Sequence, residues 1–155
     1  MGRRELREHI FRLLFRRDFF PEEEMKEQEA FYIDYLADPE QKEVDYIVQK
    51  TEKIMAMIPE LDTMVNEHSV GWQTGRMGKV DLTIIRLAVY EMKYDDDIPV
   101  SVAINEAVEL AKRYGSENSP AFINGVLAKM IYGYEQKAGL FRIKCESVYQ
   151  KSVHG

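Results

Sequence analysis

One segment, residues 80–94, constrains the fold more than any other because it is apolar on nearly every side when drawn as a helix. Its apolar residues recur at helical spacings, and they are Leu82, Ile85, Leu87, Ala88, Val89 and Met92. A helix with no polar face has to be surrounded by other parts of the protein. We therefore expect residues 80–94 to form a central buried helix on which other helices pack.

Charged residues argue against a membrane-spanning role for this segment. The longest apolar stretch, residues 82–92, is interrupted by Arg86 and Glu91, whereas a membrane helix needs about 20 predominantly apolar residues. Charges also run through the N-terminus, where a signal peptide needs an uninterrupted apolar core. The single cysteine, Cys145, excludes an internal disulfide and fits a reducing compartment. We expect a cytoplasmic protein with no membrane partner.

The remaining segments are also expected to be helical, because strand-like alternation is not sustained anywhere in the chain. The predicted fold class is all-α, with about seven helices in a single domain over residues 1–136. Residues 137–155 are expected to be a C-terminal extension, whose weak periodicity favours fraying. The expected helices span residues 3–19, 21–38, 40–57, 60–66, 80–94, 99–114 and 120–136.

Local signals predict the faces and ends of some of these helices. The second helix is expected to bear an apolar stripe of Phe31, Tyr32, Tyr35 and Leu36. Gly115 is well placed to cap the C-terminus of the helix over residues 99–114. Ser119 is expected to be the N-cap of the last helix, with Pro120 at the first helical position, where proline is favoured.

The overall net charge of −6 argues against a nucleic-acid partner, but the distribution of charge points the other way. Residues 1–17 hold six arginines against two glutamates, a net charge of +4, which leaves −10 for the rest of the chain. An acidic protein with one basic segment repels polyanions except at that segment. The arginines are Arg3, Arg4, Arg7, Arg12, Arg16 and Arg17. By charge alone, they fit the solvated face of an amphipathic helix equally well.

The residue types that enzymes use form no recognisable site in this sequence. Cys145 lacks the flanking signature of an activated nucleophile. No histidine is paired with another His or Cys at a metal-ligand spacing; the three are His9, His68 and His154. The glycines of the irregular segment, Gly71, Gly75 and Gly78, match neither a dinucleotide-binding loop nor a P-loop. We expect no enzyme activity, no metal site and no cofactor.

The predicted start of the last helix combines two features that suit single-stranded RNA. A helix start offers unpaired backbone N–H groups and partial positive charge, which favour a phosphate. Phe122 lies about one turn into this helix, where an aromatic ring can stack on an unpaired base. The alternative is that Phe122 is a core residue, as most phenylalanines near helix starts are.

Four stretches of the sequence resemble the NusB family of transcription antitermination factors. They are Arg-Arg-Glu-Leu-Arg-Glu at 3–8, Asp-Leu-Thr-Ile-Ile-Arg-Leu-Ala-Val-Tyr-Glu-Met at 81–92, Val-Ala-Ile-Asn-Glu-Ala-Val-Glu-Leu-Ala-Lys-Arg-Tyr-Gly at 102–115, and Phe-Ile-Asn-Gly-Val-Leu at 122–127. The resemblance covers roughly residues 3–132, and the C-terminal half carries most of it. It implies a fold of two packed helical bundles.

The resemblance also implies a function. Members of this family bind the boxA element of ribosomal RNA transcripts as a heterodimer with NusE, a small-subunit ribosomal protein. With other Nus factors, they help RNA polymerase read through terminators. By this resemblance, RNA would be bound by Arg3, Arg4 and Arg7 of the arginine motif and by Glu117, Asn118 and Phe122 at the last helix. Asp81 would face NusE.

Elementary electrostatics gives a reason for the partner. Three arginines supply only a modest salt-dependent attraction to phosphates, and the acidic body opposes it. We therefore expect weak binding to RNA by this chain alone and stronger binding with a partner that adds RNA contacts. The alternative function is a helical protein–protein adaptor whose arginine-rich helix binds an acidic partner surface.

Overall fold

The computed structural model of the chain describes residues 1–69 and 71–136, so the predicted extension at 137–155 lies outside the described residues. Within these ranges all regular elements are helices, seven α-helices and two short 3₁₀ helices, which confirms the all-α prediction. None of the described helices is long and apolar enough to cross a membrane. The chain divides into two compact units, at residues 1–58 and from residue 59 onward. The expectation of a single domain over residues 1–136 stays a prediction.

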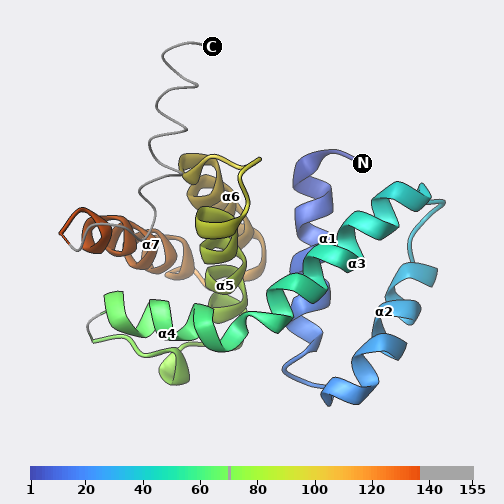
Figure 1. Ribbon diagram of the computed structural model, residues 1–155, viewed down its shortest axis with the longest axis horizontal. Coiled ribbons are helices and arrows are strands. Elements are labelled where there is room, and N and C mark those ends of the chain that lie inside the picture. Colours follow the sequence, from blue (N-terminus) through green and yellow to red (C-terminus); the bar gives the residue numbers. More distant parts are fainter. Residues whose placement is uncertain (70, 137–155) are drawn as a thin grey trace, which may run out of the picture. The chain divides into compact units, whose positions relative to one another are not determined.

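The first unit contains three α-helices and a 3₁₀ turn: α1 (Arg3–Arg16), η1 (Glu22–Glu24), α2 (Met25–Asp34) and α3 (Gln41–Ala56) (Figure 1). Helix α1 packs against both α2 and α3. The apolar residues of α1 and α3 recur at helical spacings and are buried, and they include Ile10, Leu13, Leu14, Ile47 and Ile54. This burial accounts for the amphipathic pattern of the first and third predicted helices.

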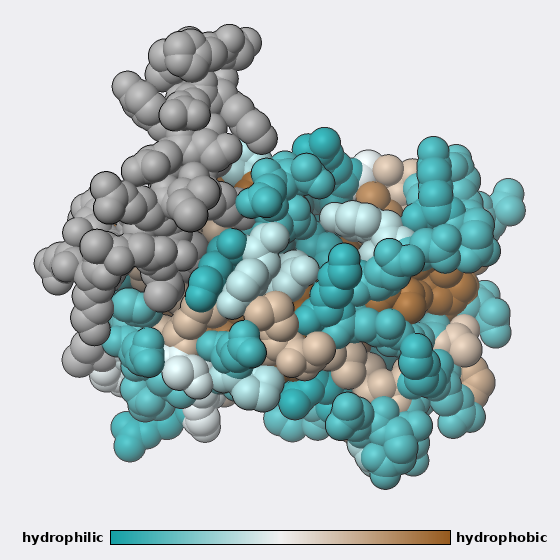
Figure 2. Space-filling view, in the orientation of Figure 1, coloured by the Kyte–Doolittle hydropathy of each residue, from teal (hydrophilic) through white to brown (hydrophobic). Residues whose placement is uncertain are grey.

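The predicted apolar stripe of the second helix is wrong in two of its four residues. Phe31 is 53% exposed and Tyr35 is 91% exposed, whereas Tyr32 is buried. One reason is that Phe31 and Tyr35, which is the C-cap of α2 in helical conformation, are four residues apart and so lie on the same side of the helix, and this side is exposed. The other is that the buried face of α2 includes a carboxylic acid, Glu29, so a search for apolar residues at helical spacing does not identify that face. In Figure 2, the strongest apolar colour of the first unit lies between α2 and α3.

The second unit is built around α5 (Lys79–Tyr94), which packs against α6 (Val100–Tyr114) and α7 (Ser119–Gln136). All residues from 82 to 89 are buried, which confirms the prediction of a central buried helix. The unit is completed by most of α4 (Ile58–His68) and by η2 (Thr74–Arg76) (Figure 1). Where the sequence predicted only a loop between α4 and α5, the structure adds this short 3₁₀ turn.

A buried arginine joins α4 to α5. Arg86 is 9% exposed, and its Nε and Nη2 donate hydrogen bonds to the two carboxylate oxygens of Asp62 at 2.8 and 2.7 Å. Bidentate pairs of this kind fix orientation as well as distance. The sequence showed Arg86 only as an interruption of an apolar stretch, and its partner lies on a different helix.

In the first unit, the buried carboxyl of Glu29 lies beside a second carboxylate, that of Glu52 on α3. Lys26 donates a hydrogen bond from Nζ to Glu52 at 2.7 Å, and this holds the pKa of Glu52 below its ordinary value. Burial, and then the negative charge of Glu52, raise the pKa of Glu29 from 4.5 to about 7. Glu29 is therefore protonated in the folded protein at a pH where it is ionised in the unfolded chain.

This pair makes stability depend on pH. Between about pH 4.5 and about pH 7 the folded state holds a proton that the unfolded state has lost, so the free energy of unfolding is expected to fall as pH rises. Urea unfolding at about pH 5 and about pH 8 measures the difference. In Glu29→Gln, which cannot ionise, this difference is expected to shrink. An equal pH dependence in both proteins would contradict the assignment.

Candidate nucleic-acid interface

The turn into α7 is held by two serines. The Ser116 backbone N–H donates to Ser119 Oγ at 2.9 Å, and the Ser119 N–H donates to the Ser116 carbonyl at 3.1 Å. Ser119 was expected to be the N-cap, but α7 already begins at Ser119. Its hydroxyl bonds back to the turn, while the Asn118 carbonyl accepts the Phe122 N–H at 3.1 Å. Phe122 therefore lies in the first turn of α7.

Gly115, between α6 and this turn, is the C-cap of α6 as predicted. Its backbone is extended rather than left-handed (φ −92°, ψ −171°), so conformational freedom is not the reason for glycine here. The reason is space, because a Cβ at this position would lie 2.6 Å from Cβ of Ser119 and 2.9 Å from the carbonyl oxygen of Ala111. The close approach fixes the start of α7 against the end of α6.

The loop after α4 carries the only tryptophan of the chain, Trp72. Gly71 supplies the positive φ (+90°) that the turn needs, and the Trp72 N–H donates to the Ser69 carbonyl at 3.1 Å. The loop is fastened to α4 because the Thr74 N–H donates to Oδ1 of Asn66 at 2.8 Å. These local bonds position the indole.

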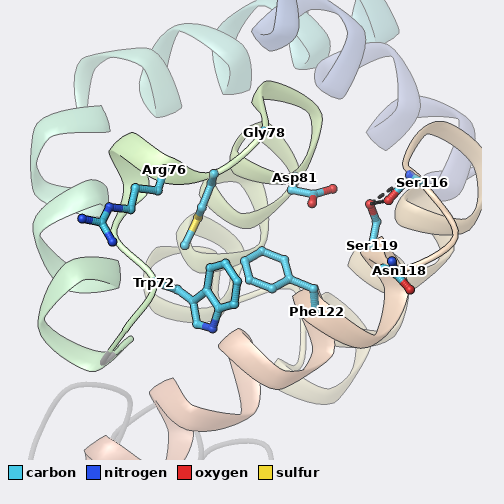
Figure 3. A pocket seen from close by; sticks show the side chains of 9 residues that line it. Trp72, Arg76, Gly78, Asp81, Ser116, Asn118, Ser119 and Phe122 are labelled. Carbon is cyan, nitrogen blue, oxygen red and sulfur yellow. Dashed lines mark hydrogen bonds between the residues drawn. The ribbon is translucent and has the colours of Figure 1, made fainter.

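Trp72 and Phe122 meet edge to face, with 5.2 Å between ring centroids and an interplanar angle of 72° (Figure 3). Trp72 is 51% exposed, and Phe122 is partly exposed. Phe122 is therefore not fully buried, and the alternative that it serves only packing stays a prediction. The pair presents aromatic surface to solvent at the start of α7.

A pocket of about 330 Å³ lies against these two rings. It is lined by Trp72, Arg76, Met77, Gly78, Asp81, Ser116, Asn118, Ser119 and Phe122. Figure 3 shows the rings together on one part of the wall and the carboxylate, hydroxyl and amide groups on another, with Arg76 extending away from the rings. Aromatic faces stack on bases, and amide and carboxylate groups pair with base edges. Over the described residues, no cluster of His, Cys, Asp or Glu is suited to hold a metal ion.

The structure gathers three of the residues expected from the sequence in this pocket: Asp81, Asn118 and Phe122. Asn118 is exposed, and Asp81, in the first turn of α5, is partly buried. Asp81 was expected on a surface facing a protein partner, yet it shares a lining with the expected RNA residues. Glu117 is exposed and lies outside this lining.

The three expected arginines lie in the first unit, on α1. Arg3 and Arg4 are exposed in its first turn, whereas Arg7 is only 6% exposed. A cation in the first turn is disfavoured by the helix dipole, so the helix gains nothing from these charges there. The arrangement suits an anion that binds both the helix start and the side chains.

Six of the nine lining residues were not among the predicted site residues, and Trp72 and Arg76 are the two with large side chains that could contact a ligand through a ring or a charge. The signal available was a lone tryptophan in a segment rich in glycine. The sequence does not show what such a residue packs on. In the structure, Trp72 packs on Phe122, which lies 50 residues further along the chain.

A model of the NusB family matches residues 4–132 of the chain. The transcription antitermination protein NusB of Lachnoclostridium phytofermentans is 50% identical over 131 residues, which cover 84% of this chain and 99% of that protein. The protein of the same name from Agathobacter rectalis is 53% identical over 129 residues, covering 83% and 98%. The structure of NusB from T. maritima superposes with a TM-score of 0.77 at 31% identity, covering 94% of this chain and 98% of that one.

Gly115→Ala tests the packing at the start of α7. The added Cβ meets Ser119 and the carbonyl oxygen of Ala111, so the free energy of unfolding is expected to fall by about 1–3 kcal/mol. The matched control is Gly75→Ala, because no described atom lies within 4 Å of a Cβ at Gly75. Chemical unfolding of the two variants checks this, and equal stabilities would show that the turn adjusts freely.

Proposed function

Because this chain belongs to the NusB family of transcription antitermination proteins, we propose that it binds boxA-type single-stranded RNA of ribosomal RNA transcripts together with NusE. The single observation that carries this is the partly exposed Trp72–Phe122 pair, which lies beside a pocket that also contains carboxylate, hydroxyl and amide groups. The family consists of non-enzymatic factors, in agreement with the prediction that the chain is not an enzyme. The proposed role belongs to the cytoplasm, and other Nus factors and RNA polymerase would take part indirectly.

In this proposal the pocket receives an unpaired base. The base stacks on the exposed aromatic surface, which every base can do because every base has a π-face. Selectivity comes from the edge of the base, where the Asn118 amide both donates and accepts. Duplex RNA would not bind in this way, because its bases are already stacked and paired.

In this proposal, arginines of α1 bind the phosphates of the RNA. Arg3 and Arg4, exposed at the start of α1, would supply the salt-dependent part of the affinity. Arg7 stays in the proposed set, but because it is buried its loss is expected to lower the free energy of unfolding as well as RNA affinity. Exposed Glu117 would accept hydrogen bonds from base amino groups rather than bind phosphate.

The need for a partner follows from charge. Outside residues 1–17 the chain carries a net charge of −10, which repels RNA. A partner such as NusE would add RNA contacts that offset this repulsion. Asp81 is the proposed NusE-facing residue. Because it also lines the pocket, the RNA affinity of Asp81→Asn should be measured both without and with NusE.

A gel-shift titration tests the proposed function. BoxA-type RNA and a scrambled RNA of the same composition are titrated with the protein, with and without NusE. We expect a preference for boxA-type RNA that strengthens when NusE is present. Equal affinity for both RNAs under both conditions would contradict the proposal. A pull-down from nuclease-treated lysate that still recovers partners would favour the adaptor function instead.

Phe122→Ala is expected to weaken binding of boxA-type RNA by about 1–3 kcal/mol, because a stacking surface is removed. Phe31→Ala is the control, since Phe31 is an exposed phenylalanine of the first unit outside the proposed site. Thermal unfolding of both variants accompanies the titration. Normal binding by Phe122→Ala with a lowered Tm would mean that Phe122 serves packing only.

Substitution of both Arg3 and Arg4 by Gln is expected to weaken binding of all RNAs and to reduce the slope of log K against log salt concentration. For single-stranded RNA the slope changes by about 0.7 for each phosphate that the protein no longer neutralises. Arg12→Gln, which removes an exposed arginine of the same helix outside the predicted motif, should leave the slope unchanged. Equal slopes in all three proteins would exclude Arg3 and Arg4 from phosphate binding.

A further inference from the structure

The Trp72–Phe122 pair also forms part of a second pocket. This pocket has a volume of about 190 Å³ and is lined by Ser69, Trp72, Ala121, Phe122, Gly125, Val126 and Lys129. The two pockets share only Trp72 and Phe122. We propose that this second pocket binds one nucleotide of the RNA, so that the aromatic pair lies between two bases of the same strand. This inference rests on the proposed function.

Ser69, which lines the second pocket, has a buried hydroxyl without a partner among the residues that the structure describes. Ser69 is 1% exposed, and its Oγ makes no hydrogen bond to any residue that the structure describes. An unpaired buried hydroxyl is costly, and a ligand that pairs with it is one explanation for its presence. A base edge offers both donors and acceptors, and the Ser69 hydroxyl can pair with either.

The second observation concerns Gly125, which lies well inside α7. A glycine within a helix destabilises it by about 0.5–1 kcal/mol relative to alanine. Packing does not require glycine here, because apart from its chain neighbours and the adjacent backbone of α7 no described atom lies within 4 Å of a Cβ built at this position. Its backbone φ is not positive either. The space left by Gly125 opens onto the second pocket, which explains a residue that the helix itself disfavours.

The geometry of α7 adds a cation to the same pocket. Ala121, Gly125 and Lys129 recur every four residues and so lie along one face of the helix. The two small residues leave the aromatic rings accessible, and exposed Lys129 lies one turn further along. An aromatic wall, a hydroxyl and an ammonium group match the base and the phosphate of one nucleotide.

The size of the pocket agrees with this ligand. Pockets for drug-sized molecules have volumes of about 300–1,000 Å³, and the second pocket, at about 190 Å³, is smaller. It suits a single planar group rather than a folded cofactor or a segment of a protein partner.

The test uses the full chain and boxA-type RNA in which one base at a time is replaced by an abasic nucleotide. Gly125→Leu fills the second pocket and is expected to weaken binding of the intact RNA about 10-fold or more. Ser69→Ala and Lys129→Gln are each expected to weaken it about 3- to 10-fold. Lys112→Gln is the charge-matched control, because Lys112 is exposed on α6 and lines neither pocket.

Folding is monitored separately. Gly125→Leu replaces a poor helix former by a good one at a position with open space, so its Tm is expected to be no lower than that of the natural protein. For one abasic position, the natural protein is expected to bind the abasic RNA more weakly than the intact RNA. Gly125→Leu is expected to bind these two RNAs with equal affinity. That position identifies the base that occupies the second pocket.

Unchanged affinity of Gly125→Leu and Ser69→Ala for the intact RNA would overturn the inference and leave the proposed function standing. A loss of affinity that is the same for every abasic RNA would also overturn it, since no base would then be linked to the pocket. If the natural protein shows no preference for boxA-type RNA over the scrambled RNA, the proposed function and the inference both fall.

Discussion

The burial of α5 is the constraint on which the second unit depends. Residues 82–89 are buried without interruption, and Arg86 is one of them. A buried guanidinium has to be paired, and Arg86 meets both carboxylate oxygens of Asp62 on α4 at 2.7 and 2.8 Å. The same helix packs against α6 and α7. It therefore holds both the helix that precedes the tryptophan loop and the helix that carries Phe122.

The aromatic pair follows from this arrangement. The loop is tied to α4 through Asn66, and the start of α7 is tied to the end of α6 by the close approach at Gly115. Trp72 and Phe122 are thereby brought together while remaining partly exposed, although burying them further would stabilise the fold. Exposed aromatic surface of this kind, beside two pockets, is typical of a surface that binds a partner.

The sequence predicted those parts of the molecule that depend on local periodicity. The all-α class and the central helix are confirmed, whereas the predicted stripe of the second helix was wrong because the buried side of α2 includes the carboxylic acid Glu29. Phe122 was found from its place at a helix start, but Trp72 could not be assigned, because its position depends on a side-chain bond from Asn66. Helical spacing grouped Arg7 with its neighbours, but it could not show that Arg7 is buried.

The central claim is that Trp72 and Phe122 bind an unpaired base. Trp72 is the only tryptophan of the chain, so the intrinsic tryptophan fluorescence of the protein reports on this site alone. We predict that boxA-type single-stranded RNA quenches this fluorescence with the same Kd as the gel shift, and that a fully duplexed form of that RNA does not. RNA binding in the gel shift with no change in Trp72 fluorescence would contradict the account.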